Sequence, residues 1–311
     1  MDGWMDGWAR LFVKINYLVV LSLYCKVWKI IESAKATFHL LIKISITPTL
    51  IMSTHRYVTV VPVYKTTPSK VEALSLMQLR QLEVKNVTLM CPEGLDIRVY
   101  LDLWPDLKVE FFDQAHFVNV QSYNDFLLQP PFYERFSKTY QWMLIYQLDA
   151  FIFSNQIEHF CDLGYDYYGA PWLSSFPQYR FLFNRWPIRI NLKRFFVGNG
   201  GFSLRKLDST ITLLQRTQGH ISQTFFMEDA FFGYWGSFNK SFHAAPPEVA
   251  ALFSIETYPG HWLRLTNTFP MGTHNFQRSG KEWAKEFFSP TLKKQYEILS
   301  EAFPKLKNLK E

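Results

Sequence analysis

The chain of 311 residues is poor in cysteine, poor in charged side chains and without a long uninterrupted apolar run. Its three cysteines, Cys25, Cys91 and Cys161, lie far apart and form no Cys-x-x-Cys motif. This spacing excludes a zinc cluster and a disulfide framework, and it favours a reducing compartment. Charged residues make up only 19% of the chain and aromatic residues 18%, which excludes a disordered or low-complexity protein. The composition therefore predicts a packed globular protein.

Positive charge is scarce outside the two ends of the chain. Of the formal net charge of +6, residues 1–56 contribute +4, from seven Lys and Arg against three acids. Residues 281–311 contribute +2, from seven Lys against five Glu, so the span between the two ends is neutral. A protein that binds nucleic acid needs a basic face to neutralise phosphates, and we therefore exclude nucleic acid as a partner.

The N-terminal leg, residues 1–56, is basic and apolar, but its apolar run is too short to cross a membrane. The uncharged stretch of residues 15–25 is well below the roughly 20 residues that a spanning helix needs. No small-residue cleavage site follows it, as a signal peptide would require. We expect the leg either to lie on an anionic membrane surface or to pack as helices on the domain or a partner. The expected location is cytoplasmic, with or without peripheral membrane contact; the alternative is a membrane-anchored protein of a secretory compartment.

From residue 57 onward, short apolar segments alternate with helical ones. Residues 57–64 are rich in β-branched side chains and predict a buried strand. Ser69, with Glu72 three residues later, predicts the capped start of a helix that runs to about Leu82. Further segments are strands at residues 86–90, 108–112 and 142–146, with an aromatic segment at 124–139. The alternation predicts an α/β domain with a largely parallel sheet over residues 57–280 and a helical tail over 281–311.

Asp149 follows the expected strand 142–146, at the edge of the sheet where ligands of parallel sheets bind. A carboxylate at this edge is a hard oxygen ligand that can hold Mn²⁺ or Mg²⁺ against a diphosphate. A helix cap or a salt bridge is the alternative. An Asp-x-Asp pair would be a more specific signal, but Gln147 stands in its first position. Gln147 can hydrogen-bond a ribose or coordinate a metal weakly, and it does not supply the missing charge.

Residues 198–205 have the sequence Gly-Asn-Gly-Gly-Phe-Ser-Leu-Arg. From Phe202 onward, apolar and polar residues alternate as in a strand. Gly200 and Gly201 let backbone amides approach a ligand where a Cβ atom would collide. We therefore expect this segment to lie beside the substrates; a plain hairpin turn is the alternative.

Glu228 and Asp229 precede an apolar segment and open a helix. The helix dipole stabilises acids in a first turn, which is the alternative to a chemical role. The functional interpretation makes Asp229 a general base that takes the proton from an attacking hydroxyl group. Neighbouring residues of a helix point about 100° apart, so Glu228 would orient substrate hydroxyls.

His274 lies in a loop after Gly272, late in the folded region. A neutral imidazole suits Mn²⁺, and the alternative is a hydrogen-bonded structural histidine. Trp172 and Glu256 are expected to line the same cleft, with ordinary packing as the alternative for each.

Four short segments thus follow one another in a specific order: Tyr146–Ala150, Gly198–Phe202, Met227–Asp229 and Gly272–His274. Together they resemble the GT-A superfamily of nucleotide-sugar glycosyltransferases, and most closely a poorly characterised subfamily with Tyr-Gln-x-Asp-Ala, Gly-Asn-Gly-Gly-Phe-Ser-Leu-Arg, Glu-Asp and Gly-x-His motifs. The resemblance covers residues 57–280 and implies a mixed, mostly parallel twisted sheet flanked by helices. It also implies metal ligation by Asp149 and His274, Gly200 and Gly201 beside donor sugar and acceptor, and Asp229 as the base.

We therefore predict a glycosyltransferase that moves a sugar, with inversion, from a nucleotide-diphosphate sugar such as a UDP-sugar to a saccharide or lipid-linked acceptor. The metal would be Mn²⁺ or Mg²⁺. A non-catalytic carbohydrate-binding or scaffold protein on a degenerate GT-A fold is the alternative. A nucleotidyltransferase would be expected to carry a glycine loop rich in Lys and Arg near its first strand, which residues 60–69 lack.

Overall fold

The computed structural model describes residues 56–173, 180–182, 186–188, 197–224 and 227–275, which all belong to one unit of the chain, Ser53–Glu311. Apart from Arg56, the predicted N-terminal leg of residues 1–56 lies outside the described residues. The predicted tail of 281–311 and the last five residues of the predicted domain, 276–280, also lie outside them. Within the described part of the chain, no helix combines the length and apolar character needed to cross a bilayer.

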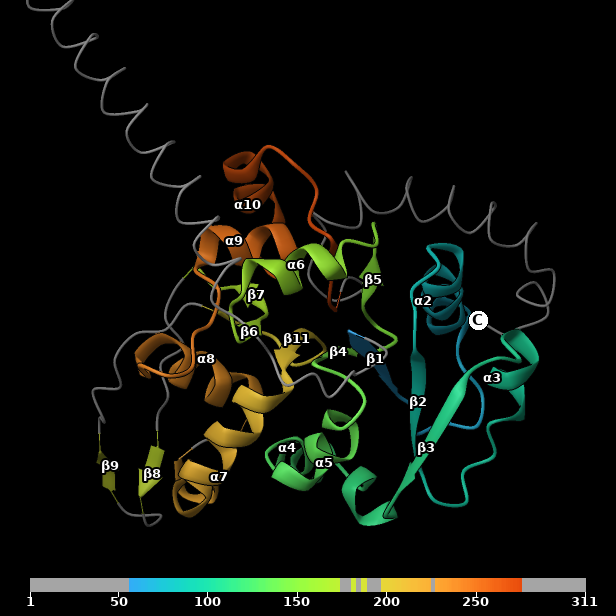
Figure 1. Cartoon of the computed structure of the whole chain (residues 1–311), viewed down its shortest axis with the longest axis horizontal. Helices are drawn as coiled ribbons and strands as arrows, with labels where there is room; N and C mark the ends of the chain where they lie inside the picture. Colours follow the sequence, from blue (N-terminus) through green and yellow to red (C-terminus); the bar gives the residue numbers. More distant parts are fainter. Residues whose placement is uncertain (1–55, 174–179, 183–185, 189–196, 225–226, 276–311) are drawn as a thin grey trace, which may run out of the picture. The chain divides into compact units, whose positions relative to one another are not determined.

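A six-stranded sheet in the order β3-β2-β1-β4-β11-β6 forms the centre of the domain (Figure 1). Its strands are β1 (Tyr57–Pro62), β2 (Val87–Pro92), β3 (Lys108–Phe112), β4 (Trp142–Tyr146), β6 (Tyr167–Tyr168) and β11 (Phe202–Lys206). The first four strands in this order run parallel, whereas β11 is antiparallel to both β4 and β6. The sheet is therefore mixed and mostly parallel, which confirms the expected fold class.

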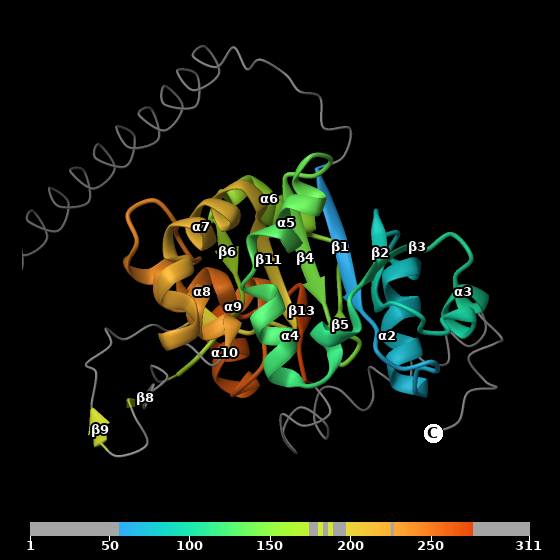
Figure 2. The same ribbon diagram turned by 90° about the horizontal axis from the view of Figure 1, so that it is seen from below.

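Helices cover both faces of the sheet (Figure 2). One face carries α2 (Lys70–Gln81), α3 (Arg98–Leu103), α6 (Ile157–Leu163), α9 (Pro247–Phe253) and α10 (Pro259–Thr266). The other carries α4 (Val120–Leu127), α5 (Pro130–Ser137), α7 (Leu207–Thr224) and α8 (Glu228–Phe238), with the 3₁₀ turn η1 (Gln114–Phe117) before α4.

The side chains of the central strands alternate between the two apolar cores. In β4, Trp142, Leu144 and Tyr146 pack with α2 and α6, whereas Met143 and Ile145 pack with α5 and α8. Successive side chains of a strand point to opposite faces, so a strand covered on both sides is apolar throughout. This is why the central segments of the sequence show continuous apolar runs.

The start of α2 confirms the predicted cap. Ser69 Oγ accepts a hydrogen bond from the Glu72 backbone nitrogen at 3.3 Å, and Glu72 Oε2 accepts one from the Ser69 backbone nitrogen at 2.8 Å. The aromatic segment 124–139 contains the second half of α4 and the whole of α5. The break falls at Gln129, whose backbone is extended because Pro130 follows it and disfavours a helical conformation.

Several strands of two or three residues lie outside the central sheet. Strands β12 (Ser254–Ile255), β13 (Gly272–Thr273) and β5 (Phe151–Ile152) form a small three-stranded sheet in that order. Strand β10 (Val197–Gly198) pairs with β7 (Ala170–Pro171), and β8 (Arg180–Leu182) pairs with β9 (Trp186–Ile188). The small sheet matters for function, because each of its strands lies within two residues of a residue of the candidate site.

Candidate active site

The small sheet brings together side chains that are far apart in the sequence. In the antiparallel pair of β13 and β5, Thr273 lies opposite Phe151, so His274 lies beside the residues that precede β5. In the parallel pair of β12 and β13, Ile255 lies opposite Thr273, so the next residue of each strand, Glu256 or His274, leaves the sheet at the same edge. The backbone nitrogen of Asn275 then donates to the Asp149 carbonyl at 3.0 Å, which closes the arrangement.

The resulting histidine cluster consists of Gln147, Asp149, Glu256 and His274. His274 Nε2 lies 3.2 Å from Asp149 Oδ1 and 3.2 Å from Gln147 Oε1. Its other ring nitrogen, Nδ1, lies 3.2 Å from Glu256 Oε1. Burial alone lowers the pKa of His274, but the hydrogen bonds with Asp149 and Glu256 outweigh it and raise that pKa to about 9. The cluster therefore favours a positive charge at the imidazole.

The donor set of this cluster fits a divalent cation. Nε2 faces two oxygens, and only a proton or a metal ion on that nitrogen can satisfy both. Glu256 on Nδ1 is the kind of partner that orients a metal-ligating histidine through its other nitrogen. Among the described residues, no three His, Cys, Asp or Glu side chains form a metal site by themselves. A metal would therefore be held by Asp149 and His274, with the Gln147 amide oxygen and the oxygens of a substrate.

The glycine loop, residues Asn199–Gly201, lies against the histidine cluster on one side and against α8 on the other. The Gln147 backbone nitrogen donates to the Gly201 carbonyl at 2.8 Å, which continues the pairing of β4 with β11. A Cβ atom on Gly201 would overlap His274 Nε2, and one on Gly200 would overlap the Glu228 carboxylate. The two glycines are thus required by close approach rather than by turn geometry alone.

Asp229 lies on the α8 side of the glycine loop and is buried. Its Oδ2 accepts a hydrogen bond from the Asn199 backbone nitrogen at 3.1 Å, and its Oδ1 accepts one from the Ala230 backbone nitrogen at 2.7 Å. Burial, together with the charges of Glu228 and Glu256, raises the pKa of Asp229 to about 7. A carboxyl group with a pKa near neutrality is suited to accept a proton under physiological conditions.

Glu228 has a different environment, because it forms a buried ion pair. Its Oε1 accepts a hydrogen bond from Arg205 Nη2 at 2.6 Å, and the Arg205 side chain is wholly buried. Arg205 also donates to Ser203 Oγ, at 3.0 Å from Nη2, and to the Tyr133 hydroxyl, at 2.5 Å from Nη1. We call Arg205, Glu228, Ser203 and Tyr133 the arginine cluster. One of the two carboxylate oxygens of Glu228, Oε1, is therefore bound to Arg205.

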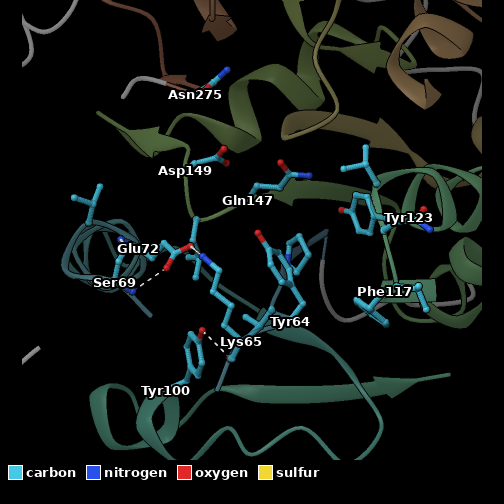
Figure 3. A pocket seen from close by; sticks show the side chains of 17 residues that line it. Tyr64, Lys65, Ser69, Glu72, Tyr100, Phe117, Tyr123, Gln147, Asp149 and Asn275 are labelled. Atoms are coloured by element: carbon cyan, nitrogen blue, oxygen red, sulfur yellow. Dashed lines mark hydrogen bonds and ion pairs between the residues drawn. The ribbon is translucent and has the colours of Figure 1, made fainter. Parts of the chain in front are cut away.

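A cavity of about 590 Å³ opens beside the histidine cluster, at the carboxyl ends of β1 and β4 (Figure 3). Gln147 and Asp149 point into it from one side, and Tyr64 and Lys65 point into it from the opposite side. The wall at the start of α2 includes Ser69 and Glu72, and the wall at the start of α4 is mostly apolar, with Phe117, Val118 and Val120. The lining carries one Lys against one Glu and one Asp, a sum of −1. A diphosphate would therefore enter this cavity most favourably together with a cation.

The structure brings most of the predicted residues together around the glycine loop, but of the nine only Gln147 and Asp149 line the cavity. Trp172 is half-buried and packs against Gly198, and it does not line the cavity. Asp229 lies outside the cavity lining too, as do Glu228, Glu256 and His274. The predicted set omitted Lys65, which follows β1 as Asp149 follows β4, so the strand-end rule could have found it.

The domain is therefore an α/β protein with a cavity and clustered titratable side chains at the carboxyl edge of a mixed sheet. The chain belongs to the family described as "Protein of unknown function (DUF5672)", which matches residues 106–274. A search among curated proteins gave no match.

Three solved structures that align with this chain are glycosyltransferases. Mouse xyloside xylosyltransferase 1 in its apo form is 16% identical, with 72% of this chain and 99% of that chain covered and a TM-score of 0.46. Galactosyltransferase LgtC in complex with donor and acceptor sugar analogs is 11% identical, with coverages of 78% and 96% and a TM-score of 0.46. Apo GlyE of Streptococcus pneumoniae TIGR4 is 12% identical, with coverages of 81% and 64% and a TM-score of 0.40. At these scores no residue role is transferred from them.

Proposed function

We propose that the protein is a glycosyltransferase that uses a nucleotide-diphosphate sugar, with a UDP-sugar as the first donor to test. The observation that carries this proposal is the glycine loop: Gly201 lies against His274, and Gly200 lies against the helix turn that holds Asp229. A candidate cation site and a candidate proton acceptor thus lie on either side of one close-approach loop. Sugar transfer from a diphosphate needs both, one for the leaving group and one for the attacking hydroxyl.

The cavity supports a donor with one flat apolar part and one charged part. Tyr64, Val118 and Val120 are exposed apolar side chains on its rim and can cover a nucleobase. Lys65 extends toward the polar side, where its Nζ pairs with Glu72 Oε1 at 2.8 Å. We assign the nucleobase of the donor to the apolar rim of the cavity. We assign its diphosphate to the side lined by Lys65 and Asp149.

In the proposed reaction, the acceptor hydroxyl oxygen forms a bond to the anomeric carbon as the bond from that carbon to the diphosphate oxygen breaks. The electron pair of the broken bond leaves with the nucleoside diphosphate, and Asp229 takes the hydroxyl proton. Inversion follows from this single displacement. The acceptor is a saccharide or a lipid-linked saccharide.

Asp149, His274 and Gln147 would hold the divalent cation, Mn²⁺ or Mg²⁺. When bound, such an ion neutralises charge that develops on a leaving diphosphate. Glu256 would orient the imidazole of His274 through Nδ1.

One observation favours the alternative of a non-catalytic carbohydrate-binding protein. Both oxygens of Asp229 accept backbone hydrogen bonds, and the side chain does not line the cavity. A base needs to reach the attacking hydroxyl in the substrate complex, although catalytic groups are often poorly aligned without substrate.

The deciding experiment is a screen of the purified full chain for hydrolysis and transfer with a panel of nucleotide sugars, with and without Mn²⁺. The proposal predicts turnover of one donor class and its loss on removal of Mn²⁺ or Mg²⁺ by a chelator. The variant Lys65→Met should weaken binding of that donor, whereas Lys85→Met, at the opposite end of the parallel strands, is the matched control. Binding of a donor with no turnover across a broad acceptor panel would favour the non-catalytic alternative.

A further inference from the structure

The arginine cluster lies on the α8 side of the glycine loop, and none of its four residues lines the donor cavity. Side chains alternate along β11, so Phe202 and Leu204 enter the core beside α2 and α6. Ser203 and Arg205 point to the opposite face of the strand, where Tyr133 and Phe232 lie. The Arg205 guanidinium carbon lies 4.6 Å from the centre of the Phe232 ring. A full positive charge is thus enclosed between aromatic rings.

Glu228 supplies the only carboxylate that the described residues place in hydrogen-bond contact with this arginine. Burial lowers the pKa of Arg205, but Tyr133 and Glu228 outweigh it and raise that pKa above its ordinary value. The Glu228 backbone nitrogen also donates to Asn124 Oδ1 of α4 at 3.3 Å. Glu228 is therefore held at three points: by Arg205, by Asn124 and by contact with Gly200.

Stability alone does not account for such a pair. Replacing a buried ion pair with apolar side chains of similar volume is often neutral or stabilising, because both charges lose their hydration when they are buried. Removing one partner is destabilising, because it leaves an unpaired buried charge. We therefore look for the function of this ion pair in the parts of the structure that it holds in place.

The ion pair holds the start of α8 against the glycine loop. Glu228 ties the first residue of α8 to β11 and touches Gly200. Asp229, the next residue, ties the same helix turn to Asn199, whose backbone is in the left-handed region at φ +83°. Asn199 Oδ1 in turn accepts hydrogen bonds from the backbone nitrogens of Gly201 and Phe202, at 3.1 and 3.3 Å. Two adjacent carboxylates therefore fasten the loop to the helix, and the Met227 side chain makes no cap.

We propose that Arg205 and Glu228 are positioning residues: their ion pair sets the spacing between the glycine loop and Asp229, and neither side chain touches the substrate. This inference rests on the proposed glycosyltransferase activity. It revises the expectation that Glu228 orients substrate hydroxyls, because Glu228 Oε1 is bound to Arg205 and both carboxylate oxygens lie against Gly200. A displacement of about 1 Å at a catalytic group can lower turnover about 100-fold.

The test compares the double variant Arg205→Met/Glu228→Leu with the parent. Thermal unfolding should stay close to that of the parent, because the apolar pair fills the same space. Donor affinity by calorimetry should be retained, whereas kcat should fall by about 100-fold. The matched control is Arg135→Met/Glu110→Leu, which removes a partly exposed ion pair of 2.5 Å between α5 and β3 and should leave both kcat and donor affinity unchanged. Glu228→Gln alone is the second variant, because it keeps the shape of the side chain.

A readout that does not need turnover separates this inference from the proposed function. Hydrogen exchange of the Asn199 backbone amide, which donates to Asp229 Oδ2 at 3.1 Å, should become faster in the double variant, because the glycine loop is no longer held at its distance from α8. An unchanged kcat in the double variant, or a loss of donor affinity with kcat retained, would overturn the inference. A parent protein without turnover would contradict the proposed function. In that case unchanged exchange of the Asn199 amide in the double variant would overturn the positioning role, and faster exchange would support it.

Discussion

Asp149 and Asp229 lie on the two sides of the same glycine loop, in opposite environments. The Asp149 side chain is 49% exposed, lines the cavity and contacts the His274 imidazole. Asp229 is only 7% exposed and accepts hydrogen bonds from two backbone nitrogens. The first arrangement suits a carboxylate that meets a cation from solvent. The second suits a carboxyl group that changes its protonation near neutral pH, since burial raises its pKa to about 7.

The two environments differ because the two aspartates occupy different positions relative to the strands and helices. Asp149 leaves the end of β4 toward open space at the edge of the sheet. Asp229 lies in the first turn of α8, whose residues Ala230, Phe231 and Phe232 are buried in the core beside α5. Two residues of one type thus acquire separate chemical roles from their positions relative to the sheet. Each of the following predictions alters one side of this comparison.

The largest expected effect is on turnover in Asp229→Asn. Asparagine keeps the size of the side chain and can still accept one backbone hydrogen bond, but it cannot take a proton. Turnover should fall by about 10²–10⁴-fold, which is the usual contribution of a general base. Donor affinity, measured by calorimetry, should be retained, because the cavity is lined by other residues. Turnover close to that of the parent would remove Asp229 as the base and favour a retaining mechanism or another acid.

The next effect is on donor affinity in Asp149→Asn. Loss of the carboxylate from the histidine cluster should lower affinity for the nucleotide sugar in the presence of Mn²⁺ by about tenfold or more, or roughly 1.4 kcal/mol. Without Mn²⁺ the parent and the variant should bind the donor equally. The matched control is Asp106→Asn, an exposed aspartate outside the cavity. Equal affinities of Asp149→Asn and the parent with Mn²⁺ present would reject Asp149 as a metal ligand.

The contact between the glycine loop and His274 predicts the outcome of Gly201→Ala. The added Cβ atom would overlap His274 Nε2, so the imidazole has to shift away from Asp149 and Gln147. Overpacking of this kind typically costs about 1–3 kcal/mol of the free energy of unfolding, measured with urea. The matched control is Gly260→Ala in α10, where the nearest atom to the new Cβ is the end of the Arg264 side chain at 3.4 Å. Equal losses in both variants would show that His274 does not restrict Gly201.

Most of the central sheet could be predicted from the sequence, because its signals are local. The apolar run at 142–146 is β4 without a change of boundary, and the Ser69 and Glu72 pattern is the observed capping box. The two-residue strands β5, β12 and β13 have no such signal, since a repeat of period two cannot be recognised in two residues. The meeting of Glu256 with His274 depends on the register of these strands, and so it required the structure.

The arginine cluster was not predictable for a different reason. Arg205 was part of a recognised segment, but an isolated arginine in a strand is ordinarily expected to face solvent. Its burial depends on Glu228 and Tyr133, which are distant in sequence. No spacing rule connects these three residues, so the sequence predicted the acids of α8 without the cation that holds one of them.

The smallest expected effect, taken over one pH unit, is a pH-dependent difference in stability between the parent and Asp229→Asn. In the folded protein the pKa of Asp229 is raised to about 7, so between about pH 4 and pH 7 the folded state keeps a proton that the unfolded state loses. The parent should therefore lose stability relative to the variant as pH rises through this window, by roughly 1.4 kcal/mol for each pH unit, and no further above it. Urea unfolding of both proteins across the window measures the difference, with Asp106→Asn as the exposed control. A difference that stays constant with pH would mean that Asp229 ionises as freely as an exposed aspartate. Asp149 and Asp229 would then differ only in their positions. Asp229 would also lack the proton affinity that a general base needs at neutral pH.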